Sequence, residues 1–102
     1  MAGSELRLLY LVANAGFGDD IVEIVKEAGV KGATIINARG EGAHHESILG
    51  ITIDTEKELI LCVASTEITE KATALIKEKV GITTPANCIC FTMKVSDSIG
   101  IS

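Results

Sequence analysis

The segment Leu6 to Ala13 is hydrophobic on both of its alternating faces. One face carries Leu6, Leu8, Tyr10 and Val12, and the other carries Leu9, Leu11 and Ala13. Only Arg7 interrupts the pattern. A strand of this kind is buried on both sides, so it belongs inside a sheet whose two faces are both covered. A chain of 102 residues forms one small domain and has few elements with which to cover a sheet.

Two segments have the pattern of amphipathic helices with marked ends. The first begins at Asp19 and ends at Gly29, which suits the left-handed conformation that closes many helices. Its hydrophobic residues fall on one helix face, at Ile21, Ile24, Val25 and Ala28. The second begins at Ser65 or Thr66, whose hydroxyls favour a helix N-terminus, and ends in a basic turn before Gly81. We therefore expect two helices.

Four further segments show the alternation of strands: Ala33 to Arg39, Ile48 to Asp54, Leu59 to Ala64 and Cys88 to Val95. The first of them runs into the sequence Gly40-Glu41-Gly42, where the backbone can approach a ligand closely. Glu41 to Ser47 is then predicted as a short polar loop. Thr55 to Glu58 is predicted as a polar bend, so that Ile48 to Ala64 forms one long bent strand or two short ones.

The order strand, helix, strand, strand, helix, strand predicts an α+β fold of the ferredoxin-like βαββαβ type, with two helices on one face of an antiparallel sheet. Residues 6–102 form the single domain, and residues 1–5 are expected to be a disordered lead-in. Two helices cover only one sheet face, yet several strands are hydrophobic on both. An uncovered hydrophobic sheet face predicts an oligomer that buries it.

The charge and cysteine content restrict the partners. A formal net charge of −5 with nine scattered Lys and Arg excludes nucleic acid and an anionic membrane surface. No hydrophobic run is long enough to cross a bilayer, so no membrane insertion is expected and the predicted location is the cytoplasm. Three cysteines inside hydrophobic runs favour reduced thiols over a disulfide framework.

Several segments together resemble one known family. They are Ala28-Gly29-Val30, Gly32-Ala33-Thr34-Ile35, Arg39-Gly40-Glu41-Gly42, Ile48-Leu49-Gly50-Ile51 and Cys90-Phe91-Thr92-Met93-Lys94-Val95. In order and spacing they are similar to the PII (nitrogen-regulatory P-II) signal-transduction family, in particular its short PII-like branch. The resemblance implies a homotrimer with ligand clefts between subunits. It also implies a regulator in nitrogen or related metabolism that binds an adenine nucleotide and acts on a partner protein such as a membrane transporter.

The same resemblance suggests where a ligand lies. It places Thr34, Gly40 and Gly42 on the adenine and backbone side of the cleft. The family's glycine-rich, lysine-ending loop is replaced here by Pro85-Ala86-Asn87-Cys88. We therefore expect AMP, ADP or a related molecule rather than ATP bound in the usual manner. The full set of predicted ligand-binding residues is Thr34, Asn37, Arg39, Gly40, Gly42, Thr84, Asn87 and Cys88.

Some residues allow two interpretations. Arg39 either holds an anionic ligand or pairs with an acidic neighbour, and Asn37 either reads a ligand or satisfies loop backbone. His44 and His45 are candidate metal ligands, which keeps a trimeric metal-binding protein of the cation-tolerance (CutA) type as the alternative function.

The remaining chemistry-bearing residues favour structural roles. Cys88 and Cys90 form either a metal or redox pair or, as we favour, part of the core. Asp54, Glu56 and Glu58 are interpreted as a solvated bend rather than catalytic carboxylates. No nucleophile–base pair or phosphate-binding motif is visible, so no enzymatic activity and no required cofactor are expected.

Overall fold

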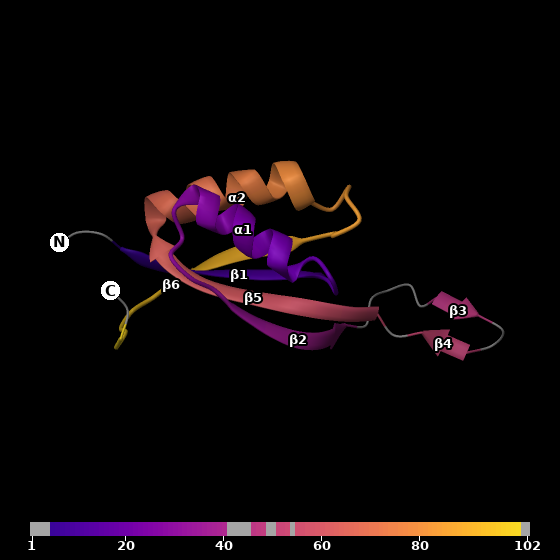
Figure 1. The fold of residues 1–102 in the computed structure, drawn as a ribbon. Helices are drawn as coiled ribbons and strands as arrows, with labels where there is room; N and C mark the ends of the chain where they lie inside the picture. The colour runs from indigo at the N-terminus through magenta and orange to yellow at the C-terminus, as the bar shows by residue number, and fades with distance from the viewer. Residues whose placement is uncertain (1–4, 41–45, 49–50, 54, 101–102) are drawn as a thin grey trace.

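The computed structural model describes residues 5–40, 46–48, 51–53 and 55–100. Four antiparallel strands form one sheet in the order β2-β5-β1-β6. They are β1 (Leu6–Asn14), β2 (Thr34–Gly40), β5 (Thr55–Ser65) and β6 (Ile89–Lys94). Helices α1 (Gly18–Ala28) and α2 (Thr66–Val80) lie together on one face of this sheet (Figure 1). The predicted ferredoxin-like fold is thus confirmed.

Both helix boundaries follow from the residues at their ends. Gly29 closes α1 with a φ of 116°, and its N–H donates to the Lys26 carbonyl at 3.0 Å. Ser65 caps α2, because its hydroxyl oxygen accepts the Ile68 N–H at 3.3 Å. The predicted helix ends are confirmed, and α1 begins one residue earlier than expected, at Gly18.

The core lies between the helices and one face of the two central strands. From β1 and β5 it takes Leu9, Leu11, Ala13, Ile60 and Cys62, and from the helices Ile21, Val25, Ala72, Ile76 and Val80. Alternation along β1 sends Leu9 and Leu11 to the helices and leaves Leu8, Tyr10 and Val12 on the other face. No helix in the described part of the chain covers that second face (Figure 1).

The uncovered side of the sheet, here called the open face, is strongly hydrophobic. It carries Leu8, Tyr10, Val12, Ile36, Leu59, Leu61, Ile89, Phe91 and Met93. Phe91 and Met93 are each 45% exposed, and Phe91 stacks on Tyr10 with ring centroids 4.7 Å apart. The prediction that the helices leave one hydrophobic sheet face uncovered is confirmed.

Two predictions about the connection between β2 and β5 are wrong. The strand that joins the main sheet begins at Thr55 rather than at Ile48, and Thr55 to Glu58 is strand, not a bend. Lys57 pairs with Asn14 on one side and Ala38 on the other, so two neighbouring strands hold these polar residues extended. The connection therefore runs over residues 41–54, longer than the predicted loop Glu41 to Ser47.

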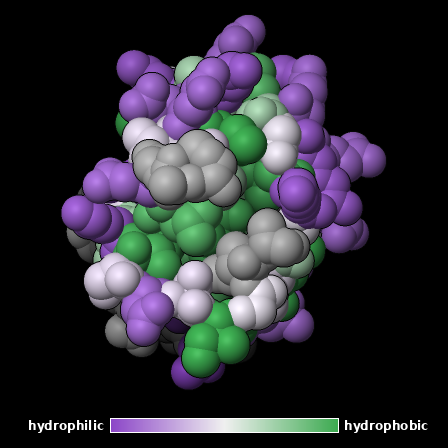
Figure 2. Space-filling view, turned by 90° about the vertical axis from the view of Figure 1, so that its left-hand side faces the viewer, coloured by the Kyte–Doolittle hydropathy of each residue, from purple (hydrophilic) through white to green (hydrophobic). Residues whose placement is uncertain are grey.

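A small hairpin lies within this connection. It consists of β3 (Glu46–Ile48) and β4 (Ile51–Ile53), which pair with each other in a separate two-stranded sheet. Figure 1 shows the hairpin beyond one end of the main sheet, whereas the start of β1 and the end of β6 lie at the opposite end. Figure 2 views that opposite end and shows hydrophobic surface at its centre, bordered by hydrophilic side chains. None of the helices in the described residues is long and hydrophobic enough to span a membrane.

Candidate ligand-binding site

The end of the sheet nearest the hairpin is polar. Ala38, Lys57 and Asn14 lie abreast there on β2, β5 and β1. The Lys57 Nζ donates to the Asn14 Oδ1 at 2.7 Å. The other end of the Asn14 amide donates through Nδ2 to the Pro85 carbonyl at 2.8 Å. One asparagine thus joins Lys57 to the segment that precedes β6.

Alternation along β2 divides the predicted ligand residues between two faces. Thr34 and Gly40 lie on the open face, together with Ile36. Asn37 and Arg39 lie on the helix-covered face, opposite Glu58 and Glu56 respectively. Thr34 and Gly40 therefore share the face of Lys57. Asn37 and Arg39 lie on the other face, in a hollow that Glu56, Glu58 and part of Lys57 also line.

Thr34 and Gly40 mark the two ends of the open-face part of β2. Thr34 pairs with Leu61 and borders a hollow of about 420 Å³ that Gly32, Val63 and Gly100 also line. From Thr34 to Ala38, level with Lys57, the strand advances four residues, or about 13 Å. A ligand that touches both Thr34 and Lys57 would lie across the hydrophobic side chains of Ile36 and Leu59.

Gly40 allows Lys57 to lie close against β2. A Cβ built on Gly40 would be 3.2 Å from the Lys57 Cγ, tighter than an ordinary contact. A side chain at this position would push the lysine stem away from the strand. Glycine is therefore the residue that permits the observed position of Lys57.

The segment from Thr84 to Cys88 is held by local hydrogen bonds and by hydrogen bonds with β1 and α2. The Thr84 hydroxyl donates to the Gly81 carbonyl at 2.7 Å, and the Asn87 N–H donates to the Thr84 carbonyl at 3.0 Å. Asn87 is exposed and adopts a positive φ of 47°. The Cys88 thiol is buried, so any contact of Cys88 with a ligand would involve its backbone.

Glu58 has a role that the sequence did not indicate. Its Oε1 accepts the N–H groups of Gly16 and Gly18, each at 2.9 Å. These two donors lie in the turn before α1 and at the start of that helix, where backbone N–H groups favour negative charge. The interpretation of Glu58 as part of a solvated bend is therefore wrong, because this carboxylate fixes the start of α1.

The three cysteines are free thiols. Burial, with a smaller contribution from Cys90, raises the pKa of Cys62 to about 11 and that of Cys88 to about 12. Burial also raises the pKa of Cys90, whose Sγ lies 3.9 Å from the Thr73 hydroxyl. Such thiols stay protonated at neutral pH, which favours the core-filling interpretation over a metal or redox pair.

No metal site is visible in the part of the chain that the structure describes, where no group of three His, Cys, Asp or Glu residues could hold an ion. The candidate metal ligands His44 and His45, and the predicted ligand residue Gly42, lie outside the described residues. Their roles stay predictions.

Lys57 and Asn14 are the residues that sequence reasoning missed. The hydrophobic alternation Leu59, Leu61, Val63 continues backwards to Lys57, and this period of two was the available signal for a strand. No local signal indicates Asn14, because its partners are 43 and 71 residues away in the sequence.

Comparison with known proteins gives a consistent result. The family model described as nitrogen regulatory protein P-II matches residues 7–102. No curated protein sequence matches the chain. Among solved structures, a PII-like signaling protein from Thermus thermophilus has 25% identity and a TM-score of 0.69, over 90% of this chain and 88% of that one.

Two more distant structures share the fold alone. CPII, a nitrogen regulatory PII-like protein from Thiomonas intermedia K12 bound to ADP, AMP and bicarbonate, has 16% identity and a TM-score of 0.71, over 95% of this chain and 97% of that one. CutA from Synechococcus elongatus PCC7942 has 9% identity and a TM-score of 0.65, over 93% of this chain and 80% of that one.

Proposed function

Because the chain belongs to the nitrogen regulatory protein P-II family, we propose that it is a cytoplasmic signalling protein whose copies bind an adenine nucleotide at the interfaces between them. Binding would then change how the hairpin segment meets a partner protein, such as a membrane transporter. The observation that carries the proposal is the Lys57–Asn14–Pro85 network at the base of the hairpin.

The open face supports assembly from identical copies, for which we propose a homotrimer. Ile89, Phe91 and Met93 are about half exposed on an edge strand, beside the stacked Tyr10. A contiguous hydrophobic face of this kind is typical of an interface rather than of a lone soluble subunit. A second copy packed against this face would also cover the part of β2 between Thr34 and Gly40 and create a cleft there.

The groups along that strip suit an adenine nucleotide. Ile36 and Leu59 offer hydrophobic contact for a base, and the Thr34 hydroxyl can donate to or accept from its polar edge. Lys57 provides a positive charge at the far end, where Gly40 leaves room for a phosphate to approach the backbone. CPII, a structural relative, is described with ADP and AMP bound.

The balance of charge favours AMP or ADP over ATP. Among the described residues along this strip, Lys57 supplies the positive charge, whereas Arg39, Glu56 and Glu58 lie on the helix-covered face. Each further phosphate adds negative charge that this one lysine must match. We therefore expect the triphosphate to bind more weakly than the diphosphate.

The position of the site explains how binding could reach a partner. Residues 41–54 leave the sheet directly after Gly40 and return directly before Thr55, two residues from Lys57. A phosphate held at Lys57 would touch the base of this connection. An ordering of that segment by the ligand is the kind of local switch that regulatory proteins use.

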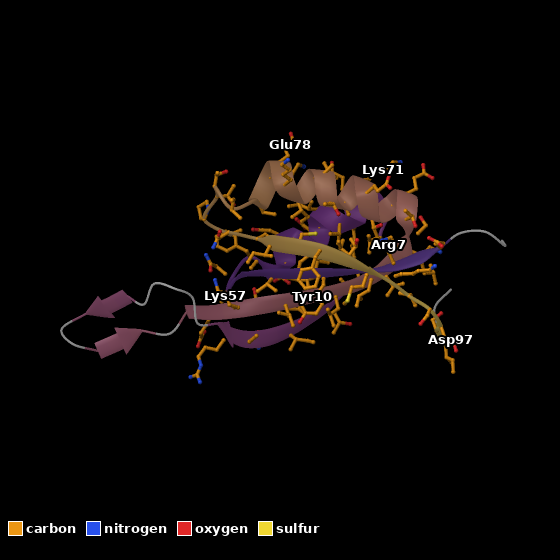
Figure 3. The ribbon with its side chains drawn as sticks, turned by 180° about the vertical axis from the view of Figure 1, so that it is seen from behind. Arg7, Tyr10, Lys57, Lys71, Glu78 and Asp97 are labelled. Carbon is orange, nitrogen blue, oxygen red and sulfur yellow. The ribbon has the colours of Figure 1, made fainter. Side chains whose placement is uncertain are left out.

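Isothermal titration calorimetry with AMP, ADP and ATP tests the proposal. Loss of one charge-assisted contact of about 1.5–3 kcal/mol predicts that Lys57→Met weakens ADP binding by about 10- to 150-fold. Lys71→Met, which removes an exposed lysine on α2 far from the site (Figure 3), is the control and should bind as wild type. No heat with any of the three nucleotides, or equal weakening by both variants, would overturn it.

A further inference from the structure

Arg7 interrupts an otherwise hydrophobic strand, and the proposed nucleotide site does not use it. Alternation along β1 places Arg7 on the helix-covered face with Leu9 and Leu11, at the end of the strand where α2 begins. Figure 3 shows Arg7 between α2 and β6, toward the opposite end of the main sheet from Lys57. A partly buried arginine in this position needs a structural or functional reason.

Among the residues that the structure describes, the guanidinium has a neutral partner only. Its Nε and Nη2 both donate to the Thr92 Oγ1, at 3.3 and 3.0 Å. Lys79 and Lys94 form ion pairs with Glu27 and Glu5, whereas no carboxylate among the described residues pairs with Arg7. An arginine has five N–H donors, and two of them donate to Thr92. The other three N–H groups are left for another acceptor.

Arg7 lies in a groove of about 550 Å³ between α2 and β6. One wall carries Thr66, Thr69, Glu70, Thr73 and Lys77, spaced along a single face of α2. The hydroxyls of Thr69 and Thr73 donate to carbonyls of their own helix. Among the described residues on the walls, Arg7 and Lys77 carry positive charge and Glu70 carries negative charge.

The other wall, β6, adds backbone donors. The Val95 N–H donates to the Leu6 carbonyl at 3.1 Å, so Val95 and every second residue before it direct their backbone groups to β1. Cys90, Thr92 and Lys94 therefore direct their N–H and C=O groups away from the sheet, along its outer edge. The side chain of Thr92 faces the groove from the same strand.

We propose that this groove is a binding site for a small oxyanion, a carboxylate or a phosphate, held by Arg7. The arginine fork matches the planar spacing of two anionic oxygens. The Thr92 hydroxyl, which accepts from Arg7, has its own proton to donate to the same anion, and the Lys77 ammonium approaches from α2. This site is at the β6 edge of the sheet, away from the β2 edge where the nucleotide is proposed to bind.

Nuclear magnetic resonance titration of the ¹⁵N-labelled protein with inorganic phosphate and, separately, with acetate tests the assignment and distinguishes the two kinds of anion. Saturable shifts are expected at the Arg7 Nε–H and at the Thr92 amide. Arg7→Gln should abolish them, whereas Lys26→Gln, which removes an exposed cation from α1 outside the groove, should leave them unchanged. The anion with the lower dissociation constant identifies the preferred class.

A second pair of variants tests the charge balance inside the groove. Glu70→Gln removes the only carboxylate on its walls and should tighten anion binding several-fold. Glu78→Gln, at an exposed position elsewhere on α2 (Figure 3), should have no such effect. Because Glu70 is exposed, this comparison does not depend on whether Arg7→Gln folds.

Three results would overturn the proposal. The first is a set of chemical-shift changes that increase linearly with salt concentration and occur at many exposed lysines. The second is saturable binding that survives Arg7→Gln in a folded variant. The third is an affinity that Glu70→Gln and Glu78→Gln change equally. None of these results bears on nucleotide binding, which is measured with separate ligands and variants.

Discussion

Glu58 should stabilise the protein through the start of α1, and the effect can be calculated from its contacts. Glu58→Ala removes an ionised acceptor from two backbone N–H groups, those of Gly16 and Gly18. Each hydrogen bond to a charged group contributes about 1.5–3 kcal/mol when its donor is shielded. The Gly16 bond is exposed and the Gly18 bond partly buried, so water replaces part of this loss. We expect a net cost of about 2 kcal/mol.

Urea unfolding monitored by circular dichroism measures this cost. All variants are compared at one protein concentration, because assembly adds to the apparent stability. Glu58→Gln is the matched control: it keeps a carbonyl acceptor but loses the charge that favours the helix N-terminus, so about half of the cost should remain. The order of stability should be wild type, then Glu58→Gln, then Glu58→Ala.

Hydrogen exchange adds a local test of the same reasoning. The Gly18 amide should exchange faster in Glu58→Ala than in wild type, by more than global stability alone explains. If Glu58→Ala instead unfolds within about 0.5 kcal/mol of wild type, in the range of ordinary surface substitutions, the carboxylate does not hold this turn in solution.

Three further predictions concern other parts of the fold. Gly29→Ala should cost about 1–3 kcal/mol in thermal unfolding because φ is 116° there, whereas Gly32→Ala, with open space around its Cβ, should be nearly neutral. Phe91→Glu should weaken self-association in sedimentation, since it puts a charge on the open face; a wild-type lone subunit at micromolar concentration would contradict the interface. Burial raises the folded-state pKa of Cys62 and Cys88 above the ordinary 9.0, so the stability they add is complete below about pH 9 and is lost as the pH rises towards 11–12. Unfolding at pH 8 and pH 10 should show this fall, and Cys62→Ala should reduce it; an equal fall in both proteins would contradict the assignment.

The fold was largely predictable because its signals are local. Gly29 and Ser65 mark helix ends through their own backbone and hydroxyl chemistry, which a single sequence shows. The double-faced pattern of Leu6 to Ala13 likewise predicts a central strand, and β1 indeed lies between β5 and β6. Helix periodicity further predicted which side of α1 packs on the sheet, because Ile21 and Val25 are buried there.

The beginning of β5 was not predictable from local pattern. Thr55 to Glu58 has the polar composition of a bend, and what makes it a strand is pairing with β2 and β1, which are distant in sequence. Backbone pairing on both sides outweighs the low strand propensity of such residues. The same error made the predicted loop too short. Residues 48–54 were assigned to the strand, but they belong to the connection that carries the hairpin.

The candidate site shows a different limit. Alternation along β2 already separated Asn37 and Arg39 from Thr34 in the sequence, yet the predicted site used both sets. Only the pairing of β2 with β5 shows that Thr34, and not Asn37 or Arg39, lies on the same face as Lys57. The carboxylate of Glu58 was equally hidden, because its two donors are 40 and 42 residues away.

Asn14 explains why the proposed nucleotide site and the segment before β6 should respond together. Its side-chain amide has one acceptor and one donor end, and the structure uses the first for Lys57 and the second for the Pro85 carbonyl. Its backbone N–H donates to the Ala86 carbonyl at 2.9 Å, so this loop is held twice. A phosphate that draws Lys57 away would leave the Asn14 oxygen without its cation and loosen the amide that also holds Pro85. Ligand binding at Lys57 would thereby be coupled to the segment before β6 through a single side chain.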